Sequence, residues 1–155
     1  MSDTVFSRVE AKLQSAGIAF SVLRHEPVFT SEQAAAIRGT PLASGAKALV
    51  CKLDEKFVMF VLPADRKLAS KAVRQSLGAR SLRFADRDEV TRLTSLAPGS
   101  IPPFGSLFDL STFCDEGLAE QPAINFNAGD HAISVSMTFA DYQVVEQPLL
   151  GKFGE

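Results

Sequence analysis

One uninterrupted apolar run limits the folds open to this chain. Residues 57–62 read Phe-Val-Met-Phe-Val-Leu, so hydrophobic side chains occupy both alternating positions. A strand with this pattern needs cover on both faces, because successive side chains point to opposite sides of a sheet. The strand, Lys56–Leu62, follows another strand-like segment, Ala46–Leu53, after a tight turn at Asp54-Glu55. The pair predicts a hairpin at the centre of a layered domain.

Helical and strand-like segments surround this hairpin without regular alternation. We predict helices at residues 3–16, 30–39, 65–78, 86–93 and 139–143, and strands at residues 18–23, 46–53, 56–62, 81–84, 107–110, 123–126 and 131–137. Short turns between consecutive strands favour antiparallel pairing. The prediction is a single α+β domain at residues 1–148, with a mixed but largely antiparallel, curved sheet and helices packed outside. Residues 149–155 are expected to form a frayed tail.

Polar residues mark the starts of several predicted helices. Thr30 and Asp86 are each followed three positions later by a glutamine or a glutamate, the pattern of a capping box. Asp65 and Thr138 are the predicted N-caps of two further helices.

The basic residues are unevenly distributed along the chain, so their local clustering says more than the net charge. The 155 residues carry a net charge of −2, which does not indicate a nucleic-acid binder. Half of the sixteen lysines and arginines nevertheless lie between Arg66 and Arg92. Such a patch can contact phosphates, and a solvated helix face without a partner is the alternative interpretation.

Signals for secretion, membrane insertion and metal binding are missing from the sequence. Residues 1–6 show no basic region followed by an apolar run, and the longest apolar run is too short to span a bilayer. We therefore expect a cytoplasmic protein in which Cys51 and Cys114 stay reduced. The sequence has no Cys-x-x-Cys and no His-x-x-x-His, so no metal site is expected.

A stiff loop is the first candidate for a functional site. Residues 93–105 contain three prolines and two glycines among large apolar side chains. Proline fixes the backbone, and glycine lets other groups come close. The N–H groups of Ser100, Ile101, Phe104 and Gly105 are candidates to stabilise an oxygen that gains negative charge. A purely structural loop is the alternative.

Three side chains could add chemistry to this loop. Lys47 lies near the start of a strand and shares its parity with Leu49, Cys51 and Leu53, so it could hold an anion or a carbonyl oxygen at a pocket mouth. His131 follows a turn and could bond a substrate oxygen. His25 is expected to organise the turn before Pro27. The alternatives are a strand-end lysine that extends its ammonium to solvent and an edge histidine that bonds only to protein groups.

Five segments in a fixed order carry a family resemblance. They are residues 25–32 (HEPVFTSE), 46–50 (AKALV), 60–68 (FVLPADRKL), 93–105 (LTSLAPGSIPPFG) and 127–131 (NAGDH). The chain resembles the YbaK / prolyl-tRNA-synthetase-associated domain family, free-standing relatives of the editing domain inserted in bacterial prolyl-tRNA synthetase. The resemblance covers about residues 5–145. Ser95 stands where a glycine is usual, which could alter the loop near Thr94.

The resemblance implies a trans-editing hydrolase that deacylates tRNA mischarged with a small amino acid (Ala, Ser, Thr or Cys), with tRNA-Pro the first candidate and no cofactor. The implied catalytic residues are Lys47, Gly99, Ser100, Ile101 and His131. The implied substrate contacts are His25, Thr30, Pro102, Pro103, Phe104, Asn127 and Gly129. The implied tRNA contacts are Lys67, Lys71, Arg74, Arg80 and Arg83, and an aminoacyl-tRNA synthetase is a candidate partner.

Two other classes of function fit the same residues. One is a binding module that holds an aminoacyl-tRNA end or a synthetase without hydrolysis. The other is a protein that binds a small metabolite in the pocket and has no RNA partner.

Overall fold

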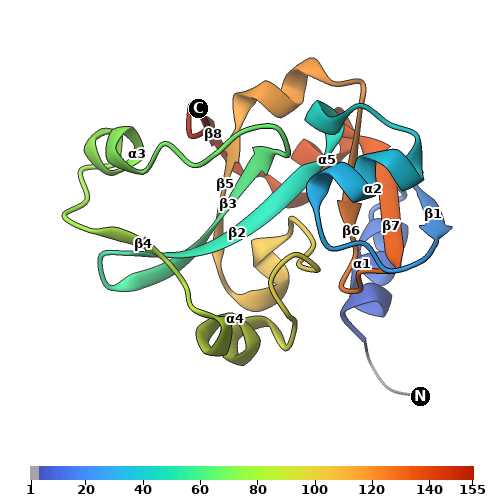
Figure 1. Cartoon of the computed structure of the whole chain (residues 1–155), viewed down its shortest axis with the longest axis horizontal. Helices are drawn as coiled ribbons and strands as arrows, with labels where there is room; N and C mark the ends of the chain where they lie inside the picture. The colour runs from blue at the N-terminus through green and yellow to red at the C-terminus, as the bar shows by residue number, and fades with distance from the viewer. Residues whose placement is uncertain (1–3) are drawn as a thin grey trace.

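Two β-sheets form the frame of the computed structural model, which describes residues 4–155 (Figure 1). The larger sheet has the order β4-β2-β3-β5-β8 and the smaller one the order β1-β7-β6. Their strands are β1 (Ser21–Arg24), β2 (Ala46–Leu53), β3 (Lys56–Pro63), β4 (Leu82–Phe84), β5 (Ser111–Asp115), β6 (Ala123–Asn127), β7 (Ile133–Thr138) and β8 (Leu149–Gly151). Pairing is antiparallel except for β3 with β5 and β5 with β8. The predicted α+β fold is confirmed, with its strands divided between two sheets.

In the described part of the chain, five α-helices and three short 3-10 helices accompany the strands. They are α1 (Val5–Ser15), α2 (Ser31–Arg38), α3 (Ser70–Ser76), α4 (Arg87–Thr94), α5 (Phe139–Glu146), η1 (Leu42–Ser44), η2 (Gly105–Phe108) and η3 (Glu116–Glu120). The predicted first residue of the first helix, Asp3, lies outside the described residues. Within residues 4–155, no helix combines the length and the apolar character that crossing a membrane requires.

Capping side chains start three of these helices as predicted. Asp86 and Glu89 form a complete capping box at α4. Thr138 accepts a hydrogen bond from the backbone of Asp141 at the start of α5. Thr30 caps α2 by accepting a hydrogen bond from the N–H of Gln33. The predicted capping box is not completed, because the Gln33 side-chain oxygen accepts from the N–H of Phe29, the residue before the cap.

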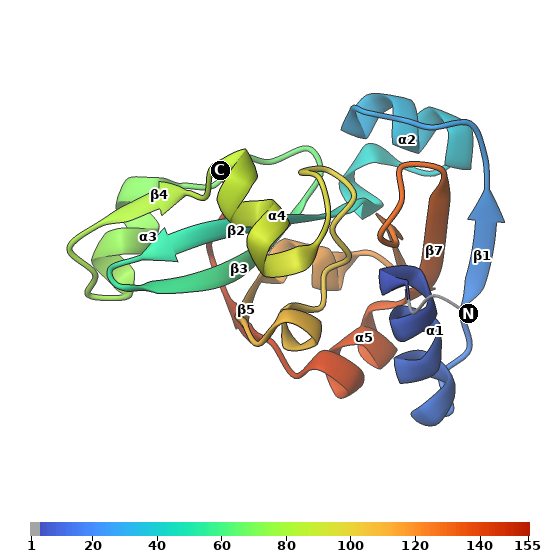
Figure 2. The ribbon, with the colours of Figure 1, turned by 90° about the horizontal axis from the view of Figure 1, so that it is seen from below.

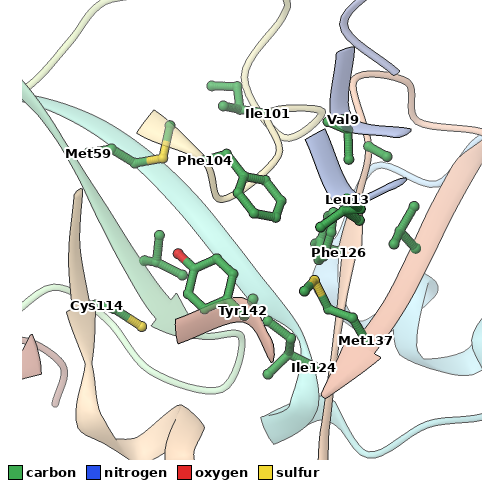
Figure 3. Packing of buried hydrophobic residues seen from close by; sticks show 14 of the residues in the cluster. Val9, Leu13, Met59, Ile101, Phe104, Cys114, Ile124, Phe126, Met137 and Tyr142 are labelled. Atoms are coloured by element: carbon green, nitrogen blue, oxygen red, sulfur yellow. The ribbon is translucent and has the colours of Figure 1, made fainter. Parts of the chain in front are cut away.

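The apolar run in β3 is covered on both faces, as its pattern predicts. Met59 and Val61 belong to the main core, which fills the space between the two sheets, α1 and α5 (Figure 3). Val58, Phe60 and Leu62 belong to a second cluster on the opposite face of the hairpin. In that cluster, α3 and the C-terminal segment supply the cover through Val73 and Phe153.

Two sequence predictions of local structure are wrong. Asp65 does not cap a helix, because α3 begins only at Ser70 and its N-cap, Ala69, makes no side-chain hydrogen bond. Residues 107–110 do not form a strand, and the backbone there continues from η2 into a left-handed residue, Asp109. Phe108 and Leu110 are buried from this turn, so apolar side chains reach the core without extended backbone.

The tail predicted to be frayed is part of the larger sheet. Residues 149–151 form β8, parallel to β5. One carboxylate oxygen of Asp115 accepts hydrogen bonds from the N–H groups of Phe153 and Gly154, each at 2.8 Å. The Phe153 ring packs edge-on against Phe60 and Phe113. The tail is ordered because it adds a strand to the edge of the sheet and a core side chain to the second cluster.

Replacing Phe153 with alanine should lower the free energy of unfolding by about 3 kcal/mol, because it leaves a cavity in the second cluster. Urea denaturation followed by circular dichroism measures this change. The exposed neighbour Lys152 provides the control, and Lys152→Ala should stay within about 0.5 kcal/mol of the wild type. Equal stability of the Phe153→Ala protein and the wild type would show that the tail does not cover the sheet.

Candidate functional site

A pocket of about 190 Å³ lies at the junction between the two sheets. The elements α2, β2 and β6, which contribute to its lining, come together there (Figure 1). Gly45 and Asn125 form an isolated bridge there that joins the start of β2 to β6. A side chain at Gly45 would press against Ala64, since its Cβ would lie 2.9 Å from the Cβ of Ala64. The pocket is lined by Phe29, Thr30, Ser31, Ala34, Arg38, Gly45, Ala46, Lys47, Ala48, Leu49, Ala64, Gly99, Ile101, Asn125, Phe126 and Asn127.

Lys47 contributes an unpaired cation to the pocket wall. It is the second residue of β2, lies opposite Leu62 of β3, and forms no ion pair within residues 4–155. Burial is the main reason that the pKa of the Lys47 ammonium is lowered. The negative charges of Asp65 and Glu32 partly oppose this shift, and the positive charge of Lys67 adds to it. The half-buried ammonium is therefore free to bond an oxygen of a ligand.

The glycine–proline loop reaches the pocket through Gly99 and Ile101. Gly99 has a φ of +92°, and a Cβ there would lie 3.3 Å from Cε1 of His131, so both conformation and space favour glycine. Two hydrogen bonds to the loop carbonyls hold this part of the loop in place. Asn127 Nδ2 donates to the Gly99 carbonyl at 2.8 Å, and the Gly129 N–H donates to the Ser100 carbonyl at 2.8 Å.

Most of the N–H groups predicted as oxyanion donors are already used. The N–H of Ser100 donates to Ala97, that of Phe104 to Pro102, and that of Gly105 to the Thr112 hydroxyl. Within the described part of the chain, the N–H groups of Gly99 and Ile101 have no protein acceptor. Both residues line the pocket, so these two groups are the available donors of the loop.

The second half of the loop is anchored in the core. The Tyr142 hydroxyl donates to the Pro103 carbonyl at 2.6 Å. The buried ring of Phe104 packs edge-on against Phe126 and Tyr142, with ring centres 5.6 and 5.3 Å away (Figure 3). Pro102, Pro103 and Phe104 are therefore structural anchors and do not belong to the pocket lining, in contrast to the substrate contacts expected of them.

His131 is not one of the residues that line the pocket, but it lies next to two that are. Its Nδ1 lies 3.1 Å from the Val28 carbonyl, which can only accept, so Nδ1 carries the proton and Nε2 is an acceptor. The imidazole ring packs against the exposed ring of Phe29, with 4.8 Å between ring centres. Its Cε1 faces Gly99. His131 thus supports two residues of the lining, Phe29 and Gly99.

An arginine that the sequence analysis missed joins the site to His25. Arg38 lines the pocket and donates to the Ser134 hydroxyl at 2.8 Å and to Asn127 Oδ1 at 2.9 Å. The same Ser134 hydroxyl lies 2.7 Å from His25 Nε2. Burial lowers the pKa of Arg38 to about 10, which leaves it charged at neutral pH. Helical spacing could have revealed it, because Arg38 lies four residues after Ala34, the buried residue of α2.

The remaining predicted residues divide between the pocket and more distant positions. Thr30 and Asn127 line the pocket, whereas Ser100, His25 and Gly129 are not part of its lining. The predicted tRNA contacts on α3 and β4 lie elsewhere, at the far end of the hairpin from α2 (Figure 2). Arg83 there forms an ion pair with Glu89 at 2.7 Å. Lys67 lies nearer to the pocket, since its charge acts on the Lys47 ammonium. Within residues 4–155, no three His, Cys, Asp or Glu side chains cluster as metal ligands would.

Three similarities to known proteins accompany this geometry. The chain is 37% identical to the multifunctional Ser/Thr-tRNA deacylase ProXp-y of Escherichia coli K12, over 94% of this chain and 90% of that protein. It is 24% identical to the prolyl-tRNA editing protein ProX of Acetoanaerobium sticklandii, over 88% of this chain and 87% of that one. A solved structure provisionally described as a trans-editing enzyme for prolyl tRNA synthetase has the same fold, with a TM-score of 0.85, 22% identity and coverage of 100% and 99%.

The family assignment rests on a match that includes the whole pocket lining. The sequence model of the aminoacyl-tRNA editing domain matches residues 25–144, which contain every residue of the pocket lining. The match spans well over half of the chain, and the relatives named above are similar along nearly their whole length. This chain belongs to the aminoacyl-tRNA editing domain family.

Proposed function

We propose that the protein is a trans-editing hydrolase that removes a small amino acid from mischarged tRNA. The observation that carries this proposal is the convergence of Lys47 with Gly99 and Ile101 on one small pocket. A cation and two free N–H donors there suit an ester whose carbonyl oxygen gains negative charge as water attacks. The relative named Ser/Thr-tRNA deacylase supports this reaction class.

The chemistry required of the protein is modest, because an aminoacyl ester is already activated. In the proposed mechanism, Lys47 and the N–H groups of Gly99 and Ile101 hold the carbonyl oxygen and stabilise the tetrahedral oxyanion. Water adds to the carbonyl carbon, and the ribose oxygen leaves as a hydroxyl. Nε2 of His131 is an acceptor, which suits it to orient the water or a ribose hydroxyl beside Gly99.

Small side chains set the proposed size limit of the pocket. Its walls include four alanines, and one of them, Ala64, is in close contact with Gly45. A rigid wall excludes a larger aminoacyl group more strongly than one methylene of extra contact attracts it, since that contact contributes about 1–3 kcal/mol. Alanyl, seryl, threonyl and cysteinyl groups are the proposed substrates, and the prolyl group is the proposed excluded one.

The proposed setting is the cytoplasm, with the tRNA body lying across the basic residues of α3, of β4 and of the segments just before each of them. These are Lys67, Lys71, Arg74, Arg80 and Arg83. An aminoacyl-tRNA synthetase that delivers the tRNA is a candidate partner. A non-catalytic binding module has less support, because a bound acceptor end does not require the two loop N–H donors to be kept free.

Purified protein should hydrolyse at least one of alanyl-, seryl-, threonyl- and cysteinyl-tRNA faster than the spontaneous rate, while prolyl-tRNA stays intact. Release of the labelled amino acid at fixed pH and salt measures this rate. Binding without any hydrolysis on the whole panel would support the binding-module alternative. Absence of salt-sensitive tRNA binding would instead favour the small-metabolite alternative.

Lys47→Ala should lower kcat/KM for deacylation about tenfold or more, because it removes a charge that stabilises the transition state, at about 1.4 kcal/mol per tenfold. Lys52→Ala is the matched control, since Lys52 lies on the same strand but contacts the Phe57 ring instead of the pocket. Both variants should keep the wild-type circular dichroism spectrum. Unchanged turnover in Lys47→Ala would remove this lysine from the mechanism.

Lys71→Glu should raise the KM for aminoacyl-tRNA severalfold and reduce the salt dependence of binding by about one unit of slope, because one phosphate contact is lost. Lys12→Glu makes the same change of charge on α1, at the other end of the molecule (Figure 2). If both variants behave alike, the tRNA does not lie on α3.

A further inference from the structure

Among residues 4–155, Asn125 is the one deeply buried polar residue of the pocket lining whose side-chain acceptor has no protein partner. Only 6% of the residue is exposed, and it lies in the middle of β6 beside the bridge to Gly45. It is one of the residues that line the pocket. A buried amide normally uses its oxygen and its nitrogen, so the destination of each atom indicates what the pocket can bind.

The hydrogen bonds of the Ser44 hydroxyl determine the orientation of the Asn125 side-chain amide. The Ser44 hydroxyl donates its hydrogen to the Pro41 carbonyl at 2.7 Å. Ser44 Oγ can therefore only accept from the Asn125 side chain, which lies 2.9 Å away, so the nearer atom is the Nδ2 amide nitrogen. The amide oxygen, Oδ1, must point the other way.

Oδ1 of Asn125 accepts no hydrogen bond from residues 4–155. Every fully buried side-chain nitrogen and oxygen in this part of the chain has a partner, so Oδ1 keeps some accessible surface. The cavity that this residue borders is the pocket. The structure thus presents a fixed acceptor to whatever group occupies the pocket.

The charges of the pocket wall indicate which donor suits this acceptor. Arg38 and Lys47 are both cationic, and the lining contains no Asp or Glu. The α-ammonium group that every aminoacyl ester carries is disfavoured as the donor to Oδ1, because it would then lie between these two cations, and like charges repel each other most where water is scarce. A neutral hydroxyl meets no such repulsion and pairs well with an amide oxygen.

We propose that Asn125 is a specificity-determining residue, whose Oδ1 accepts a hydrogen bond from the side-chain hydroxyl of a seryl or threonyl group in the pocket. This inference rests on the proposed deacylase function. It divides the small amino acids into hydroxylated substrates, which bond Asn125, and alanine, which leaves the acceptor unpaired. A site built to bond a hydroxyl discriminates against the analogue that lacks it.

The test compares seryl- and alanyl-tRNA of the same tRNA species as substrates of four proteins: wild type, Asn125→Leu, Asn125→Ala and Ser44→Ala. Leucine keeps the volume of asparagine and removes the acceptor, and alanine covers the case in which leucine does not fold. Ser44→Ala breaks the same Asn125–Ser44 hydrogen bond but keeps Oδ1, so it reports the structural part of the effect. Binding of non-hydrolysable 3′-seryl-amide and 3′-alanyl-amide adenosine gives a readout that needs no turnover.

The wild type should deacylate seryl-tRNA with the higher kcat/KM. Either Asn125 variant should lower that value about tenfold more than it lowers the value for alanyl-tRNA, because both variants also lose the hydrogen bond to Ser44. Ser44→Ala should affect both esters alike. Equal losses on the two esters in the Asn125 variants, or no loss on either, would overturn the role of Asn125 while the deacylase function stands. If the wild-type protein hydrolyses neither of these esters, and also neither threonyl- nor cysteinyl-tRNA, the deacylase function is overturned together with this inference.

Discussion

The close contact between the two sheets at Gly45 is the constraint on which the site depends. The strand bridge to Asn125 and the hydrogen bond between Asn125 and Ser44 hold β6 against the start of β2. Because Gly45 has no side chain, Ala64 can pack directly against its backbone. A pocket therefore forms where two sheets meet rather than on the surface of either, and its lining comes from segments distant in sequence.

The glycine–proline loop is held in place mainly by side chains outside the pocket lining. Phe104 is packed in the main core, and Tyr142 holds the Pro103 carbonyl. These contacts immobilise one end of the loop, while Asn127 holds the other end at the Gly99 carbonyl. Free N–H groups in such a frame need little reorganisation when charge develops on a bound oxygen, which is the main requirement for electrostatic stabilisation.

Some structural elements could be predicted from the sequence and others could not. The capping box at Asp86 and the doubly apolar strand at residues 57–62 were predictable, because each follows from local hydrogen bonding or from alternation. The segment at 107–110 was not, since an apolar turn and a short strand have the same composition. Phe153 likewise gave no local signal, because its burial depends on a parallel strand partner far away in the chain.

The sequence by itself determined the fold class, the family and the identity of Lys47 and the glycine–proline loop as candidates, since these depend on periodicity and on ordered motifs. Only the tertiary structure decided which members of the loop face the pocket, and it brought Arg38 and Asn125 into the wall. The reason is physical: a strand or helix pattern fixes which side of an element a residue occupies. Whether that side meets a cavity, a core or another sheet depends on how distant elements pack.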